Sequence, residues 1–586
     1  MAGPSSSRGL TSEQIIQFLD EPTDENVQIC DSGSELESDD IGDNIASDNE
    51  SVSSDSDTEA NDAENAGDLR TKRARLQSSW KWENARNNFA PNKIPFSGEQ
   101  GPLHQIESTI DAFKLFFDLP LMTTIVNETN RYANDFINSN LEQLKPRSRV
   151  NNWKDVTVDE MYVFFALQML MGIVQKPTLK SYFSKNPLLE TAIFSKTMTQ
   201  DRFELLNRFI HFVNNSDLET YVGNKKLFKL QPIITQLNQA YKSAYNMGEN
   251  IAVDESLTLW KGRLGIKTYL PLKSAKFGIK SYEVCESSTG YLWQFIIYTG
   301  STTDIETDIV STEAVKTSQI VIKLVQPLFN FGHSLWMDNY YNSPDLCLLL
   351  KENKINVAGT LRLNRKNVPD SIKNAKLKKG ELDAYHSQGV MVLKWMDKKP
   401  VSFISTFHDA SLISKQKQGK EIIKPKCIEE YNKHMGGVDV KDQKLQSYLI
   451  ERKKCMKWYL KMFRRLLNTS VHNALIIYSA NKDTKPLDHL AFRLQLIKEI
   501  LETHGKTLES PRQGRPSKLP TPDRLTARHF IERIPPTDKK AKPTKRCPVC
   551  CKKTGKRKET SFWCKDCGVG LCLENCFKIY HTEANY

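Results

Sequence analysis

The sequence has 586 residues, a net charge of +12 at pH 7, 39% hydrophobic residues and 9% aromatic residues. A chain of this length exceeds what one hydrophobic core usually supports, so we expect several structural units joined by linkers. No uninterrupted apolar run approaches the ~18 residues of a membrane span, and no apolar signal core follows Met1. We therefore expect neither a membrane protein nor a secreted one, but a protein of the cytosol or nucleus.

Charge is unevenly distributed along the chain. Residues 31–68 contain 14 acidic residues and no Lys or Arg, so the total of +12 leaves +26 for the remainder. Residues 1–95 are poor in large apolar groups, which predicts a disordered acidic arm. The basic remainder favours a polyanionic partner, although a Lys-rich soluble surface has the same balance. The arm ends in a basic cluster that fits a nuclear import signal or a solvated charge run: Arg70, Lys72, Arg73 and Arg75.

A helical domain is predicted from residue 105 to residue 247. Apolar residues recur there at three-and-four spacing in IDAFKLFF, MYVFFALQML and RFELLNRFIHF. Thr157 and Glu160 form a capping-box pair just before the second of these runs, which marks a helix start.

An α/β region is predicted to follow. Three stretches rich in β-branched and aromatic residues, IAVDESLTLW, FGIKSYEVCES and YLWQFIIYTG, have the composition of strands. A helical stretch, another strand in HSLWMDN and a helix near Pro344 come next. This order is that of a ribonuclease H-like core. The β-rich pieces between residues 356 and 430 are interpreted as an insertion.

Three aspartates stand at the ends of expected elements in this region. Asp254 follows the apolar run that ends at Val253, and Asp338 follows the strand that ends at Met337. Asp439 comes after two glycines and begins a helix that we expect to return the chain to the core. In a ribonuclease H-like sheet the first and fourth strands are neighbours and a later helix crosses them. The three carboxylates are therefore able to converge.

Converging carboxylates suit a pair of hard divalent cations. Mg²⁺ prefers oxygen ligands, and two such ions ~3.5–4 Å apart stabilise the attacking and leaving oxygens of a phosphoryl displacement. Each aspartate taken singly is equally well explained as a helix cap or a solvated turn residue. Their local sequences have to decide between these interpretations.

Basic residues near the acidic positions are candidates for phosphate contacts, and a solvated helix face explains them as well. A helix expected from Ile450 spaces four cations at steps of four. The segment Gly514-Arg515-Pro516 is either half of a minor-groove hook or part of a flexible linker. The candidate DNA-binding residues are Lys261, Arg263, Lys453, Lys457, Lys461, Arg465 and Arg515.

Seven of the 12 cysteines fall between Cys547 and Cys576. In a protein outside the secretory route this clustering indicates metal ligation rather than disulfides, and the number of ligands predicts two Zn²⁺ ions. An eighth ligand is missing, for which Cys551 is one candidate. Basic residues before the module favour DNA binding over recruitment of a protein partner. The expected ligands are Cys547, Cys550, Cys564, Cys567, Cys572, Cys576 and His581.

Three segments carry a family resemblance. NIAVDESLTLWKGR, LWMDNYYNSPDL and YNKHMGGVDVKDQ, in this order and followed by a terminal cysteine module, resemble the acidic motifs of piggyBac superfamily transposases. The ending CFKIYHTEANY is similar to that of the transposable element-derived group. The resemblance implies that Asp254, Asp338 and Asp439 form a catalytic triad holding Mg²⁺ or Mn²⁺, and that the two zinc sites are interleaved. Asp442 matches a fourth acid of the third motif, although it also fits a first-turn carboxylate that interacts with the helix dipole.

The resemblance implies a cut-and-paste DNA transposase. Such an enzyme nicks element ends, lets the freed 3′-hydroxyl form a hairpin on the opposite strand, and joins the ends into TTAA sites. We then expect terminal inverted repeats of double-stranded DNA as partner, a homodimer in the nucleus, and neither a membrane nor a small-molecule substrate. The alternative is a domesticated nuclear DNA-binding protein that no longer transposes. A zinc-module ubiquitin ligase or chromatin reader leaves the acidic motifs unexplained.

The expected architecture is a multidomain α/β protein. Its parts are a disordered acidic arm (1–95), a helical dimerisation or DNA-binding domain (96–248), a ribonuclease H-like catalytic core in two parts (249–355 and 431–500), a β-rich insertion (356–430), a linker (501–545) and a zinc-binding cysteine-rich module (546–586).

Overall fold

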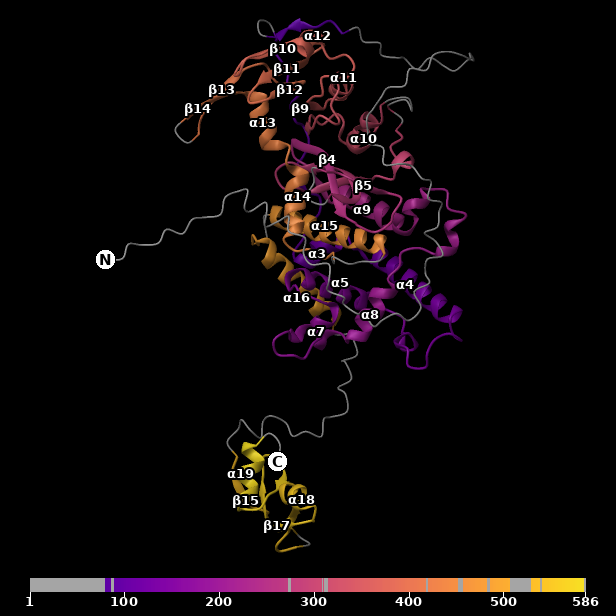
Figure 1. Cartoon of the computed structure of the whole chain (residues 1–586), viewed down its shortest axis with the longest axis vertical. Coiled ribbons are helices and arrows are strands. Elements are labelled where there is room, and N and C mark those ends of the chain that lie inside the picture. Colours follow the sequence, from indigo (N-terminus) through magenta and orange to yellow (C-terminus); the bar gives the residue numbers. More distant parts are fainter. Residues whose placement is uncertain are drawn as a thin grey trace, which may run out of the picture. The chain divides into compact units, whose positions relative to one another are not determined.

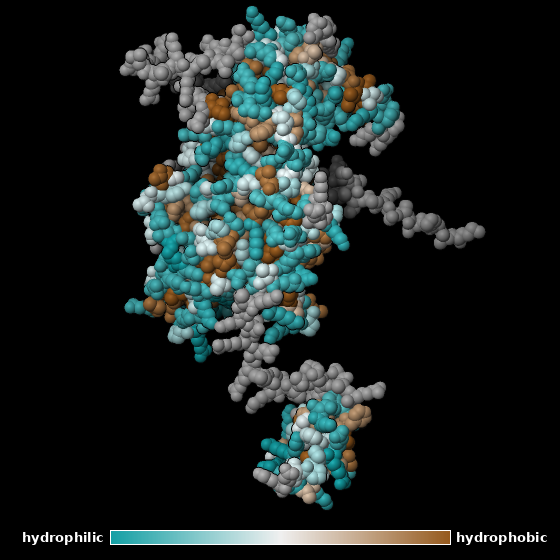
Figure 2. All heavy atoms as spheres, turned by 180° about the vertical axis from the view of Figure 1, so that it is seen from behind, coloured by the Kyte–Doolittle hydropathy of each residue, from teal (hydrophilic) through white to brown (hydrophobic). Residues whose placement is uncertain are grey.

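The computed structural model describes residues 80–85, 89–271, 276–307, 309, 315–417, 420–451, 457–481, 485–505, 529–537 and 540–583 (Figure 1). Among these residues, no helix combines the length and the apolar composition that crossing a bilayer requires. Hydrophilic residues cover most of the face shown in Figure 2, where apolar side chains appear in scattered groups.

The predicted helical domain is confirmed. Its longest buried helix is α5, whose N-cap Thr157 accepts a hydrogen bond from the backbone N–H of Glu160, as the capping pattern predicts. The Glu160 carboxylate pairs with Arg202 at 2.6 Å instead of completing the box. The helices are α3 (Thr109–Lys114), α4 (Leu119–Ser139), α5 (Val158–Ile173), α6 (Leu179–Tyr182), α7 (Ala192–Thr197), α8 (Gln200–Phe209) and α9 (Gln231–Ala244).

A mixed sheet forms the centre of the α/β region. Five of its strands have the spatial order β7, β6, β4, β8, β9. β4 is antiparallel to β6 and parallel to β8, and β8 is parallel to β9, which is the ribonuclease H-like arrangement predicted from the element order. The strands are β4 (Asn250–Leu259), β6 (Phe277–Glu286), β7 (Leu292–Ile297), β8 (Ser334–Met337) and β9 (Asn356–Thr360).

The predicted boundary of the insertion at residue 356 was wrong. β9 begins at that residue and pairs with β8, because its near-complete burial makes it a central strand rather than part of an appendage. The inserted strands then extend the same sheet, with β12 paired to β9 and β11 and β10 beyond it. These strands are β10 (Leu382–Ser387), β11 (Val390–Met396) and β12 (Pro400–Ser405), and the insertion also contains α12 (Asp370–Asn374).

The predicted disordered arm, residues 1–95, extends too far, because the residues at its end belong to the folded part of the chain. A short strand, β1 (Glu83–Asn84), pairs with β10, and Ala85 is buried in the core. Further along, the Ile94 backbone exchanges two hydrogen bonds of 2.9 Å with the side chain of Asn356 in β9. We call residues 80–98 the strap. Residues 1–79, with the acidic run and the basic cluster that ends at Arg75, lie outside the described residues.

Helices cover both faces of the sheet. α14 lies on the face that carries Glu283, which pairs with Lys441 of that helix. α10 lies on the opposite face. Gln294, which shares this face with Val284, donates a hydrogen bond to the carbonyl of Lys323 in α10. The expected helix start near Ile450 was wrong, since α15 begins at Trp458. The helices are α10 (Lys316–Val325), α11 (Pro344–Glu352), α13 (Lys426–His434), α14 (Gly437–Gln446), α15 (Trp458–Ala480) and α16 (His489–His504).

A small module closes the described chain. It begins before residue 546, because β15 pairs with β18 across the cysteine-rich segment and so takes residues from the predicted linker. Its core is formed by five buried residues that include Cys547 and Cys564. The elements are β15 (Ile531–Arg533), β16 (Lys545–Arg546), α18 (Pro548–Thr554), β17 (Glu559–Thr560), β18 (Phe562–Cys564), β19 (Val569–Gly570) and α19 (Cys576–Thr582).

Candidate functional site

Two of the predicted acidic residues sit on neighbouring strands. Val253 of β4 is paired with Met337 of β8 in the parallel ladder, so Asp254 and Asp338 follow a matched pair of positions. Neighbouring strands lie ~4.8 Å apart, and residues in register point to the same face. Both carboxylates therefore lie on the same face of the sheet. Asp338 directly follows β8, as predicted, but Asp254 lies in the middle of β4 and not at a strand end. Both side chains are partly exposed.

α14 brings the third aspartate, Asp439, to the same face of the sheet. Gly437 at the start of the helix lies against Ala252, where a Cβ atom would stand 3.4 Å from the Ala252 Cβ and 3.0 Å from the Glu286 carbonyl. Further along, Asp442 of α14 accepts hydrogen bonds from Ser256. Ala252, Asp254 and Ser256 are at every second position of β4, so their side chains lie on one face of the strand. Gly437 lies against Ala252 and Asp442 against Ser256, so Asp439, between them in α14, lies over the middle of this face. Asp439 itself is exposed in the first turn of the helix.

The negative charge of the aspartates affects the pKa values of two neighbouring side chains, those of Tyr431 and Glu255. Burial raises the pKa of the Tyr431 phenol to about 12, and the negative charges of Asp338, Asp254 and Asp439 add to this effect. Burial also raises the pKa of Glu255 to about 8, together with a hydrogen bond to Asp254 and the charges of Asp254 and Asp338. The three aspartates thus act on one phenol at the same time, and they create a local excess of negative charge.

Asp442 belongs to a separate network of charged side chains near the three aspartates. It accepts a hydrogen bond of 2.5 Å from Arg465 and lies 3.0 Å from the ammonium of Lys441, which also pairs with Glu283. Burial opposes ionisation of Asp442, but Lys441 and Arg465 outweigh it and lower the pKa of the carboxyl. The carboxylate oxygens of Asp442 are therefore engaged by cations of the chain. No local sequence pattern indicated that Glu283 belongs to this network.

The predicted basic stripe is not an exposed surface. Lys461 and Arg465 are buried, with exposed fractions of 6% and 9%, because Arg465 turns inward to Asp442. The ammonium of Lys457 donates to the carbonyl of Arg208. Lys261 and Arg263 are exposed, as a phosphate contact requires. Lys453 and Arg515 lie outside the described residues.

The cysteine-rich module contains two groups of four potential metal ligands. The first consists of Cys547, Cys550, Cys572 and Cys576, whose ligand atoms all lie within 4.8 Å of one another. Their Sγ atoms approach to 3.7 Å between Cys550 and Cys572 and 3.3 Å between Cys550 and Cys576. Four thiolates at such spacing match a tetrahedral Zn²⁺ shell, in which each Zn–S bond is ~2.3 Å.

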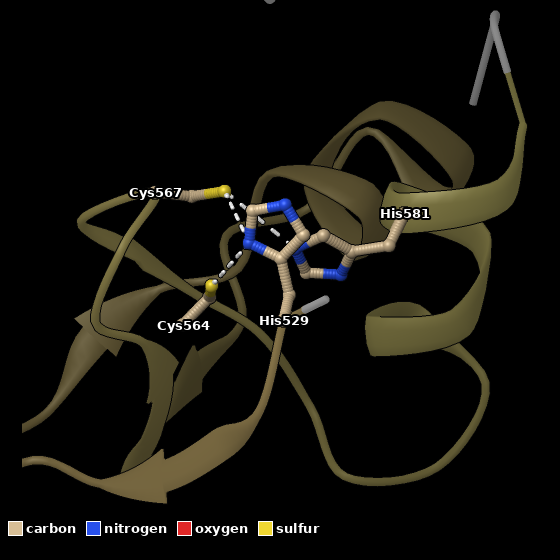
Figure 3. A group of neighbouring side chains, drawn as sticks. All are labelled: His529, Cys564, Cys567 and His581. Carbon is tan, nitrogen blue, oxygen red and sulfur yellow. Dashed lines mark hydrogen bonds between the residues drawn. The ribbon is translucent and has the colours of Figure 1, made fainter. Parts of the chain in front are cut away.

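The second group combines two histidines with two cysteines (Figure 3). The Nδ1 atom of His529 lies 3.4 Å from the Sγ of Cys564 and 3.5 Å from that of Cys567. The Nε2 atom of His581 lies 3.6 Å from the Sγ of Cys567. His581 donates its Nδ1–H to the carbonyl of Phe577 at 2.8 Å, which leaves Nε2 free of a proton for a metal.

His529 occupies the position of the eighth donor, which the sequence analysis left unassigned. It stands 18 residues before Cys547, across a Lys- and Pro-rich stretch, so the cysteine spacing did not reveal it. The missing eighth donor was the only signal for such a residue. Cys551 belongs to neither group, and its Sγ accepts a hydrogen bond of 3.1 Å from Arg546. The ligand order along the chain interleaves the two groups.

Known proteins resemble this chain in sequence and in fold. Residues 108–475 match the family described as Transposase IS4, and residues 526–582 match a family described as DDE_Tnp_1-like zinc finger. Human PiggyBac transposable element-derived protein 3 is 27% identical over 73% of this chain and 71% of its own length. Human PiggyBac transposable element-derived protein 2 is 25% identical over 70% of this chain and 68% of its own length.

A solved structure described as a piggyBac transposase synaptic complex with hairpin DNA has the same fold. It superposes with a TM-score of 0.63 at 22% identity and covers 81% of this chain and 99% of that chain. The family match extends over most of the chain, from the first helix of the helical domain into α15, and therefore includes all three aspartates. The chain belongs to the piggyBac superfamily of transposases and carries a C-terminal zinc-binding module.

Proposed function

We propose that this protein is a metal-dependent DNA transposase whose catalytic residues are Asp254, Asp338 and Asp439. The observation that carries the proposal is the placement of two carboxylates on matched positions of β4 and β8, with the start of α14 across them. A structural role as caps or turn residues explains each aspartate singly. It does not explain why all three lie close enough to Tyr431 for their charges to raise the pKa of its phenol.

The residues fit a pair of Mg²⁺ or Mn²⁺ ions. Carboxylates offer the oxygen ligands that these ions prefer. Burial raises the pKa of Glu255, and the charges of Asp254 and Asp338, which cations would neutralise, raise it further. Asp254, Asp338 and Asp439 would hold the ions, which when bound supply electrostatic stabilisation of the oxygens at the reacting phosphorus. The protein's part is to fix three carboxylates on rigid elements. Lys441 and Glu283 serve this end by anchoring α14 to β6.

Double-stranded DNA is the proposed substrate. The structural neighbour is described as a synaptic complex with hairpin DNA, which supports DNA as the substrate and a hairpin as one of its forms. Nicking before the hairpin and joining at TTAA afterwards are proposed from the family resemblance. Lys261 and Arg263, both exposed and just beyond β4, are proposed to contact the phosphate backbone. A nuclear homodimer that pairs two element ends is part of the same proposal.

The C-terminal module is proposed to bind two Zn²⁺ ions and to take part in recognition of element ends. Its two groups of ligands supply four donors each, which fills two tetrahedral shells. Lys545, Arg546 and Lys552 line a shallow hollow on its surface, so phosphate groups meet positive charge there.

The decisive experiment is a cleavage assay with purified protein, Mg²⁺ or Mn²⁺, and DNA that carries the element's terminal repeats. We expect nicks and hairpins from the wild type, and a loss of at least ~1,000-fold in rate for Asp254→Asn and Asp338→Asn with unchanged DNA binding. Asp397→Asn, an exposed aspartate in the turn after β11, is the matched control. Equal activity of Asp254→Asn and the control would overturn the assignment.

A domesticated DNA-binding protein is the second candidate. The human relatives are described as derived from a transposable element, which favours this alternative. A gene without flanking inverted repeats and TTAA duplications, whose product binds DNA but makes no nicks in the assay above, would support it.

A further inference from the structure

A two-stranded ribbon stands apart from the main sheet. It consists of β13 (Leu412–Lys417) and β14 (Lys420–Pro425), which pair only with each other among the described strands (Figure 1). Five side chains of one face, Leu412, Ser414, Gln416, Glu421 and Ile423, are all exposed. An isolated ribbon of this kind is only marginally stable in water, so its presence calls for a role beyond packing.

The ribbon carries an excess of positive charge on its other face. Lys415 is paired with Ile422 and Ile413 with Lys424, which puts both lysines on the same face of the ladder. Lys417 and Lys420 follow as the next pair in register toward the turn. The segment 412–425 contains four lysines and one acidic residue, Glu421. The four lysines thus occupy successive steps of one two-stranded ladder.

The ribbon is tied to the helix that precedes α14. The ammonium of Lys415, in the half of the ladder nearer the turn, pairs with Glu429 of α13, and its side chain nevertheless remains 57% exposed. The ribbon therefore lies beside the first turns of α13. This helix is followed by Gly436 and by α14, which carries Asp439.

We propose that the β13–β14 ribbon is a DNA-binding arm, which contacts the phosphate backbone of the duplex on which the aspartates act. A two-stranded ribbon has the dimensions to follow a DNA groove, and lysine ammonium groups bind phosphates without reading sequence. The role rests on the proposed function, since it requires the duplex that the three aspartates act on.

The test compares two double variants of the full-length protein. Lys415→Gln with Lys424→Gln removes two charges from the ribbon, and Lys398→Gln with Lys399→Gln removes two exposed charges from the turn between β11 and β12. Fluorescence anisotropy at several salt concentrations gives the affinity for a duplex with terminal repeats and for an unrelated duplex. We expect the ribbon variant alone to lower the slope of log K against log[salt] by ~2, equally on both duplexes.

Hydroxyl-radical footprinting of the same complexes locates the contact. The ribbon variant is expected to lose protection over one stretch of the backbone outside the cleavage position and to retain it elsewhere. Equal slopes and footprints for both variants, with a wild type that binds and cleaves, overturn the DNA-binding arm and leave the proposed function intact. A wild type that binds neither duplex overturns both proposals.

Discussion

Ser256 and Asp442 join β4 to α14: the Oγ atom of Ser256 lies 3.0 and 2.9 Å from the two carboxylate oxygens, which share the hydrogen bond that its hydroxyl donates. Arg465 and Lys441 surround the same carboxylate and are both buried. Replacement of Asp442 by Asn leaves two buried cations with one acid fewer. We expect Asp442→Asn to lower the free energy of unfolding by ~3–5 kcal/mol, measured by urea denaturation.

Asp439→Asn is the matched comparison, since Asp439 is exposed on the same helix. We expect it to abolish cleavage while changing stability by less than ~0.5 kcal/mol. If Asp442 were a metal ligand rather than an anchor of α14, its variant would resemble Asp439→Asn in both measurements.

His529 gives a test of the second group of ligands in the zinc module. His529→Ala should reduce the zinc content from about two ions per chain to about one, measured by mass spectrometry of the desalted protein. After substitution by Co²⁺, the variant should keep the visible bands of a four-thiolate site and lose those of the mixed site. Cys551→Ser is the control and should retain both ions, because Cys551 belongs to neither group.

The strap predicts how much of the N-terminus the fold needs. Removal of residues 1–98 takes away β1 and both hydrogen bonds between Ile94 and Asn356, so we expect a clear fall in the thermal midpoint. Removal of residues 1–79 leaves these contacts in place and should leave the midpoint unchanged. Differential scanning calorimetry of the two truncated chains distinguishes the cases, and equal midpoints would show that the strap contributes nothing to stability.

Stability should fall in mild acid because of buried histidines. Burial lowers the pKa of His472 from 6.5 to about 3, with a further effect from the positive charge of Arg493. Below pH 6.5 the unfolded state binds a proton at this histidine, whereas the folded state binds it only near pH 3. The contribution to the free energy of unfolding is therefore complete above pH 6.5 and declines as the pH falls from 6.5 towards 3. For one such histidine the loss at pH 5 is ~2 kcal/mol.

The variant His472→Gln isolates this contribution. Its free energy of unfolding should lose ~2 kcal/mol less than that of the wild type between pH 7 and pH 5, whatever its stability at pH 7. His104→Gln removes an exposed histidine and serves as control. A pH dependence of His472→Gln that matches the wild type would contradict the assignment.

The sequence was sufficient to predict the ribonuclease H-like core because its strands are marked by local composition. β4, β6 and β7 contain runs of β-branched and aromatic residues, which marked them as strands. Asp338 directly follows β8, as predicted, whereas Asp254 lies in the middle of β4 rather than at a strand end. Asp439 was predicted at a helix start because two glycines precede a helical pattern, and it lies in the first turn of α14.

The remaining features depend on contacts between distant residues. Nothing near Lys461 or Arg465 shows that α15 is buried on most of its surface, so a four-residue spacing of cations looked like a solvated stripe. The membership of β9 in the central sheet depends on pairing with β8, and that of the strap depends on Asn356. His529 reaches Cys564 only because β15 pairs with β18. Sequence patterns do not encode such partners.

The interleaved order of the zinc ligands makes the module sensitive to where the chain is cut. A product that ends just after Cys576 retains all four thiolates of the first group but only His529, Cys564 and Cys567 of the second. Three donors do not fill the tetrahedral shell of a structural Zn²⁺ site, so such a cut would open the second group while the four donors of the first stay together. Loss of His581 alone would therefore weaken metal binding in one half of the module and leave the other half complete.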